Sequence, residues 1–318
     1  MEDDTAIATR SDTLMQYGRR SARGEGLTVG FSWCLAGCVS LSCGASDGAA
    51  GSVAFAPYTP TAITKDAMLG ASIGPDSPGS QPRLRIDGYF VERGAGNAAD
   101  GYSYEGHKAT CQRAQSGSCS LVQCTFADDP AFEIAPAVYR SAGDITFQRG
   151  ADAAVKVPFE DKTEAYGYQQ ASPKAFAAGE RFTFVAAGGE VPAFTATVTF
   201  DGTPSMTTPK NTEKVTAKRS ANFDVAWSGM TAGKVSMVFQ DTTPTERAKR
   251  SYLECIFDGV GGKGTIPADL LALFEAGDEL STNPAAVATK VKAGDWEVAV
   301  GIGRSDSCNQ CGFSVKLE

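Results

Sequence analysis

The sequence of 318 residues contains a single histidine, His107, and this scarcity removes several enzyme mechanisms. Hydrolases of the Ser-His-Asp type need a histidine as general base, and His107 lies in a polar stretch, "YEGHKATC". The sequence also lacks the HExxH motif of zinc hydrolases. We therefore assign no catalytic residue, no metal ligand and no cofactor from the sequence.

Basic residues and long apolar runs are scarce as well. The chain has 29 Lys and Arg against 37 Asp and Glu, a net charge of −8 and a pI of about 4.9. Repulsion from phosphate backbones makes nucleic acid an unfavourable partner for such a chain. The most apolar run, residues 27–37, is shorter than the roughly 20 residues that span a bilayer.

That short apolar run has instead the features of a signal peptide. A signal core is about 7–15 residues long and follows positive charge, and an arginine-rich stretch, residues 19–23, precedes this run. The run ends in Leu35-Ala36-Gly37-Cys38. These residues resemble the lipobox of bacterial lipoprotein signals, and the resemblance covers residues 15–38 only. It implies cleavage before Cys38 and attachment of several acyl chains, palmitate among them, which together anchor the mature protein in a membrane.

Two features bear on this resemblance. Residues 1–14 are acidic, unlike the start of a signal, so we expect Met15 to be the true first residue. Val39 follows Cys38, and in lipoproteins an aspartate there often retains the protein in the inner membrane. The resemblance thus implies a cell-envelope location at the outer membrane or cell surface. The alternatives are a plain secretory signal, or a buried strand or helix that ends at Cys38.

Residues 38–82 are rich in Gly, Ala, Ser, Pro and Thr and show no sustained period. This composition is typical of a flexible tether.

Alternating, β-branched segments separated by Gly, Asp, Asn and Pro then predict an all-β fold. The expected strands are residues 83–91, 144–149, 154–160, 181–187 and 193–200, followed by 221–227, 234–240, 251–257, 295–303 and 312–318.

The strands predict one or two β-sandwich (Ig-like) domains. A Pro/Thr-rich patch at residues 202–212 is the candidate boundary, giving a sandwich over 83–202 and a second over 203–318. A single larger sandwich is the alternative. "TIPADLLALFEAG" predicts a short helix near residues 266–276 that covers one end of the second sandwich. Trp227 is expected in the core of that sandwich.

The cysteines after residue 43 are candidates for disulfides, because an envelope protein meets oxidising conditions. They fall into two groups of three: Cys111, Cys119 and Cys124, then Cys255, Cys308 and Cys311. An odd number per group means that a bridge joins the groups or that two thiols stay free. Fifteen pairings are possible for six cysteines, and spacing alone does not choose among them. The Cys308–Cys311 motif could also bind metal or exchange disulfides.

Other candidate sites carry little signal. Paired carboxylates for sugar hydrolysis could come from Asp128, Asp129, Glu160, Asp161 and Glu164, but nothing singles them out and solvated loop charges are the better explanation.

Residues 92–106 offer oxygen ligands in a Gly-rich loop without the spacing of a calcium site. Tyr166 and Tyr168 would share one face of a strand, where they could stack on a sugar or simply pack.

Together these features predict a membrane-anchored envelope lipoprotein with a binding or surface-structural role, whose ligand is a protein or a glycan. The alternatives are a secreted carbohydrate-active enzyme on a β scaffold, and a redox or metal protein that uses Cys308 and Cys311.

Overall fold

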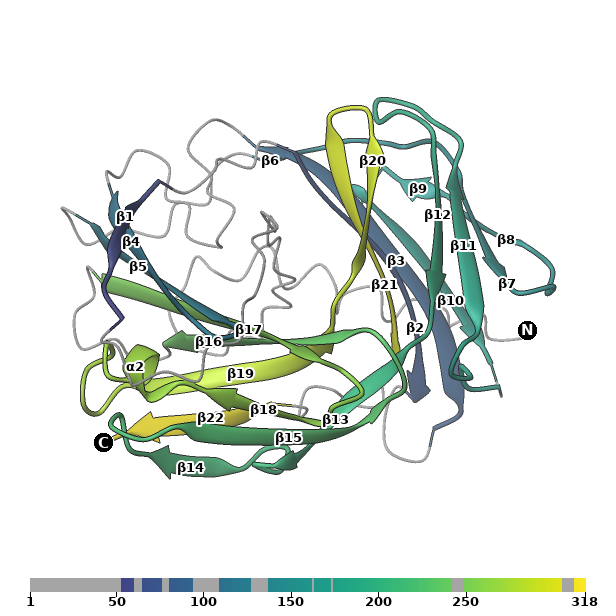
Figure 1. Ribbon diagram of the computed structural model, residues 1–318. Helices are drawn as coiled ribbons and strands as arrows, with labels where there is room; N and C mark the ends of the chain where they lie inside the picture. The colour runs from purple at the N-terminus through teal and green to yellow at the C-terminus, as the bar shows by residue number, and fades with distance from the viewer. Residues whose placement is uncertain are drawn as a thin grey trace, which may run out of the picture.

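The computed structural model describes residues 53–59, 65–75, 80–93, 109–126, 137–161, 163–172, 174–241, 249–304 and 312–318. Within them the chain forms β-strands and one short helix, arranged in four sheets. The sheets stack in pairs, and each pair encloses its own apolar core. The prediction of an all-β, sandwich-built fold is therefore confirmed (Figure 1).

The first sandwich joins a seven-stranded and a four-stranded sheet. The seven-stranded sheet contains β20 (Thr289–Ala293), β21 (Trp296–Arg304), β2 (Lys65–Pro75), β3 (Pro82–Arg93), β10 (Ala165–Ala171) and β9 (Phe159–Glu160), with β6 (Ala137–Tyr139) paired to β3. The four-stranded sheet contains β12 (Phe194–Thr199), β11 (Arg181–Ala186), β7 (Ile145–Arg149) and β8 (Val155–Val157).

The second sandwich joins an eight-stranded and a three-stranded sheet. The eight-stranded sheet contains β1 (Ala56–Tyr58), β4 (Ala109–Ser116), β5 (Cys119–Phe126), β17 (Lys249–Asp258), β16 (Lys234–Asp241), β19 (Glu279–Ala286), β22 (Phe313–Leu317) and β14 (Lys214–Ala217). The three-stranded sheet contains β13 (Gly202–Thr208), β15 (Phe223–Met230) and β18 (Lys263–Ile266).

Aromatic side chains fill the first core. Phe182 and Phe184 alternate with exposed residues on β11, so both face inward. Their rings lie 5.9 and 5.1 Å from that of Phe147 on β7. On the facing sheet, Phe90 contacts Trp296 edge to face with ring centroids 6.1 Å apart. Alternation along each strand thus determines which side chains meet between the sheets.

The second core contains the predicted tryptophan and helix. Trp227 on β15 is buried, and its Nε1 donates a hydrogen bond to the Gly259 carbonyl at 2.9 Å. The helix is α2 (Ala268–Leu271), shorter than the predicted segment, and its Leu270 and Leu271 enter the same core. Both predictions are confirmed.

All segments expected to be strands from their alternation lie in strands of the structure. The tether assigned to residues 38–82 differs, because β1 and the eleven-residue strand β2 lie within it. Ala67, Leu69, Ala71 and Ile73 of β2 are buried in the first core. Small Ala and Gly residues give this strand a weak hydrophobic contrast, so its period of two is hard to recognise.

The division into sandwiches at residues 83–202 and 203–318 also differs from the structure. The chain does pass from the first sandwich to the second between β12 and β13, at the expected boundary. However, β4 and β5 belong to the second sandwich, and β20 and β21 return to the first. Strand β21 pairs in parallel with β2, so distant segments complete each sheet.

Candidate functional site on the outer face of the seven-stranded sheet

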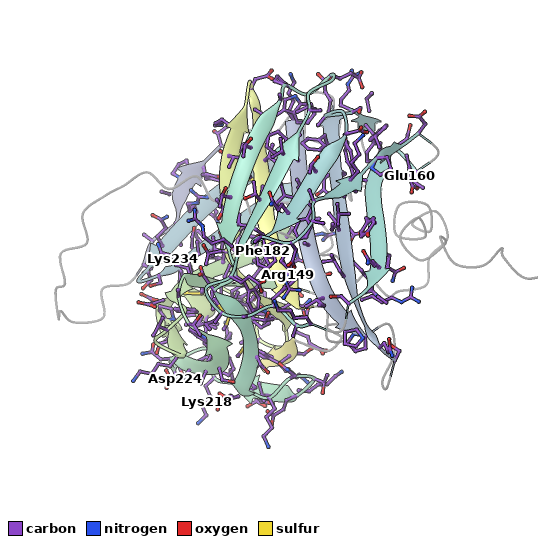
Figure 2. The ribbon with its side chains drawn as sticks, turned by 90° about the vertical axis from the view of Figure 1, so that its right-hand side faces the viewer. Arg149, Glu160, Phe182, Lys218, Asp224 and Lys234 are labelled. Atoms are coloured by element: carbon purple, nitrogen blue, oxygen red, sulfur yellow. A yellow bond between two sulfur atoms is a disulfide. The ribbon has the colours of Figure 1, made fainter. Side chains whose placement is uncertain are left out.

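The carboxylates considered for sugar hydrolysis do not line a shared site in the described residues. Glu160, Asp161 and Glu164 are exposed and lie in the tight turn from β9 to β10. The Thr163 hydroxyl donates to Glu160 Oε2 at 3.2 Å, a contact within that turn. Figure 2 shows Glu160 at the periphery of the molecule. Asp128 and Asp129 lie outside the described residues.

The two tyrosines of β10 are packing residues. Tyr166 is buried. Its hydroxyl accepts a hydrogen bond from the Ala142 amide at 2.7 Å and donates one to the Gly143 carbonyl at 2.8 Å. Burial raises the pKa of this phenol above its usual range. Tyr168 is half-buried against the same core and hydrogen-bonds to Gln170. Neither ring presents a free stacking platform for a sugar.

Four of the six candidate cysteines form two disulfides, and both lie in the eight-stranded sheet. Cys111 on β4 is bonded to Cys124, its cross-strand partner on β5. Cys119 on β5 is bonded to Cys255 on β17, across 136 residues of sequence. This second bond joins the two cysteine groups, which is one of the two outcomes that the odd counts allow.

Several predicted sites fall outside the described residues: Cys38, His107, Cys308, Cys311 and most of the stretch 92–106. At the start of that stretch, Glu92 accepts a hydrogen bond from Arg140 Nε at 2.9 Å. The described residues contain no cluster of three or more His, Cys, Asp or Glu side chains able to hold a metal ion. Nor does any helix among them have the length and apolarity to cross a membrane.

A different group of residues stands out on the seven-stranded sheet. Ile86, Phe90 and their alternate neighbours face the core, so Asp87 projects from the opposite face of β3. The strand registers place Gly70 of β2 and Gly167 of β10 directly beside Asp87. Gly301 of β21 lies next to Gly70. Asp87 is therefore the one side chain in a row across four strands.

This row lies on the face turned away from the four-stranded sheet. No described sheet packs on this face, yet Val91 and Ala299, which lie on it outside the core of the first sandwich, are almost fully buried. A Cβ built on Gly167 would meet no atom within 4 Å. The glycines thus leave bare backbone around a carboxylate.

The Asp87 carboxylate has an unusual electrostatic environment. It makes no hydrogen bond or salt bridge with another residue of the described part of the chain. Burial raises its pKa to about 6, although the positive charge of Arg85, two positions along the strand, lowers it in part. The group is therefore mostly ionised at pH 7 and mostly protonated below pH 5, so it can accept or share hydrogen bonds with a ligand.

Asp66, a second carboxylate on the same face in the described part of the chain, lies far from Asp87. Asp66 of β2 is paired with Val91, four positions from Asp87 along β3, and accepts a hydrogen bond from Tyr89 at 3.5 Å. Four residues of strand span about 13 Å, beyond the roughly 5–10 Å of paired glycosidase carboxylates. Asp66 and Asp87 therefore do not form a glycosidase pair.

Sequence reasoning did not single out Asp87 because it occupies a polar position of an ordinary alternating strand, "RLRIDGYFV". Its glycine neighbours come from positions 70 and 167, far away in the chain. Only the strand pairing reveals the row.

Comparisons with known proteins add no function. No family model matches the chain, and no curated protein matches it. Among solved structures, a chimeric titin Z1Z2-Z1Z2 tandem functionalized with a GRGDS peptide from fibronectin aligns over 58% of this chain and 91% of its own, at 11% identity. Its TM-score is 0.14, too low to support any argument.

Proposed function

We propose that the chain is a lipid-anchored, non-catalytic binding protein of the cell envelope. In this proposal Cys38 carries the acyl anchor, and the two sandwiches present a binding surface outside the cytoplasm. The partner is a protein or a glycan, recognised through the face of the seven-stranded sheet around Asp87.

The observation that carries the envelope location is the Cys119–Cys255 disulfide, with the Cys111–Cys124 bond beside it. Disulfides persist in oxidising compartments and are rare in the cytosol. Export also agrees with the signal-like segment before Cys38. The carboxylate of Asp87, with bare backbone on both sides, supports the binding role.

Anchoring is tested with the full chain and two matched variants. Cys38→Ala removes the acyl acceptor, whereas Cys43→Ala removes a neighbouring cysteine that lacks the lipobox context. We expect wild type and Cys43→Ala in the membrane fraction and Cys38→Ala in the soluble fraction. Intact mass should show a mature chain that begins at Cys38 and carries acyl chains. An unmodified Cys38, or a Cys38→Ala variant that stays with membranes, would refute the anchor.

Binding is tested with the soluble Cys38→Ala chain on an array of immobilised glycans and extracellular proteins. We expect a ligand whose affinity falls about tenfold or more in Asp87→Asn, because a hydrogen bond to a charged group contributes roughly 1.5–3 kcal/mol. Asp152→Asn, at an exposed turn on the other sheet, is the control. Binding that is insensitive to Asp87→Asn would remove this face from the proposal.

A further inference from the structure

A second polar site lies on the face of the eight-stranded sheet opposite its core, near the β14 edge. Leu280 and Thr282 of β19 are buried, so Ser281 projects to the other face. By the same alternation Ser314 of β22 projects there, beside Ser281 in the register. Lys214 of β14 pairs with Ser314 on its other side. Three adjacent strands thus place two hydroxyls and an ammonium in one row.

This row forms part of a pocket with a volume of about 200 Å³. Its polar lining is contributed by Thr212, Lys214, Ser281, Asn283, Gly312 and Ser314.

Gly312 shapes one wall of this pocket. A Cβ at that position would lie 1.9 Å from the Thr282 carbonyl oxygen and 2.2 Å from Asn283 Oδ1. Because no side chain fits there, the backbone of residue 312 can lie directly against Asn283.

Three polar side chains of the pocket have no hydrogen-bond partner among the described residues. The Ser281 and Ser314 hydroxyls make no hydrogen bond with any residue in the described part of the chain, and the Asn283 side chain likewise makes none. Each group can both donate and accept through its hydroxyl or amide. They would therefore match a ligand with several hydroxyl groups of its own.

The charge of the pocket favours a neutral ligand over an anion. Lys214 Nζ lies 3.6 Å from Glu279 Oε1, so a carboxylate already partners the only cation in the lining. A phosphate or sulfate would have to displace or oppose Glu279. A polyhydroxylated neutral molecule needs no such compensation.

The volume limits the ligand to about one ring. Sites for drug-sized ligands measure roughly 300–1,000 Å³, and a water occupies about 30 Å³. A pocket of about 200 Å³ is smaller than these sites and has room for several waters. A single pyranose with its hydroxyl groups can replace these waters and reproduce their hydrogen bonds, whereas a longer saccharide would extend out of the pocket.

We infer that the pocket between β14, β19 and β22 binds one neutral sugar residue of a glycan, through Ser281, Ser314 and Asn283. The inference rests on the proposed binding function and specifies a second contact point for its ligand.

The test uses the full-length Cys38→Ala chain and the methyl glycosides of glucose, galactose, mannose and N-acetylglucosamine, with saturation-transfer NMR and titration. At least one glycoside should bind. The double variant Ser281→Ala/Ser314→Ala should lose about tenfold in affinity, because it removes two hydrogen bonds to the ligand. Ser228→Ala, exposed on the three-stranded sheet, should bind like the parent. Asn283→Ala provides an independent variant if the double one does not fold.

Absence of binding by all four glycosides would overturn the inference, and so would binding that survives both Ser281→Ala/Ser314→Ala and Asn283→Ala. Binding of inorganic phosphate that is lost in Lys214→Met would likewise overturn it in favour of an anion site. The two proposals can fail separately. An array ligand whose binding depends on Asp87 and is unaffected by the serine variants would leave the proposed binding function intact and remove only the sugar pocket.

Discussion

Arg149 organises one end of the first sandwich, and its removal should destabilise that sandwich strongly. The guanidinium is almost completely buried at the end of β7, near Phe182 in Figure 2. It pairs with Glu180 through Nε–Oε1 at 2.6 Å and Nη2–Oε2 at 3.1 Å. It also donates to the carbonyl of Lys174 at 2.9 Å and to that of Ala175 at 2.6 Å.

The perturbation is Arg149→Met, which keeps much of the side-chain volume and removes every donor. It leaves the Glu180 carboxylate and two backbone carbonyls without these partners. Breaking a buried ion pair by removing one member costs about 3–5 kcal/mol. We expect the free energy of unfolding to fall by that amount. The double variant Arg149→Met/Glu180→Leu should recover much of the loss, because no buried charge then remains unpaired.

The assay is urea unfolding of the first sandwich, followed by the fluorescence of Trp296 in a Trp33→Phe/Trp227→Phe background, because the sequence has three tryptophans. Trp296 lies in the first core and Trp227 in the second, so the substitution removes the signal of the second sandwich. The control is Lys156→Met, which breaks the salt bridge to Asp144 between two largely exposed side chains. Such a pair contributes about 0–1 kcal/mol.

Equal losses in the free energy of unfolding for Arg149→Met and Lys156→Met would refute the importance of the buried ion pair. So would a Glu180→Leu change that adds to the loss in Arg149→Met instead of reversing it. The pH dependence gives a second check. The hydrogen bond from Arg149 holds the pKa of the Glu180 carboxyl below its usual range, so this stabilisation is present above about pH 4.3 and is lost as pH falls through the lower folded-state value.

The remaining predictions concern the disulfides and Asp87. Removing the Cys119–Cys255 bond by paired Cys→Ala changes should destabilise the protein by about 5 kcal/mol, and removing Cys111–Cys124 should destabilise it by about 3 kcal/mol. The difference follows from chain entropy, because the two bonds close loops of 136 and 13 residues. A larger loss of thermal stability for the Cys111–Cys124 variant would contradict this ranking. Because burial raises the folded-state pKa of Asp87 to about 6, stability should fall as pH rises from about 4 to 6, by at most about 3 kcal/mol. Asp87→Asn should flatten this slope in urea titrations at several pH values, and an unchanged slope would assign the titration to another group.

Local alternation predicted some of the strands of this protein and several features of its cores, but it missed β2. Phe182 and Phe184 fall on the same face of residues 181–187 by the period of two, and burial of that face follows from hydrophobicity alone. The sequence likewise placed Trp227 inside and predicted the helix of α2 from its spaced leucines. These features depend on neighbours within a few residues.

The tertiary structure alone decided which strands lie side by side. Alternation with a period of two shows which face of a strand is buried, but it does not show which strand pairs with it or in which register. The pairing of β21 with β2, the partners of Cys119 and Cys255, and the glycines beside Asp87 all join segments that are remote in sequence. The row of Ser281, Ser314 and Lys214 has the same origin. Both candidate binding surfaces therefore arise from long-range strand pairing, which local sequence pattern does not encode.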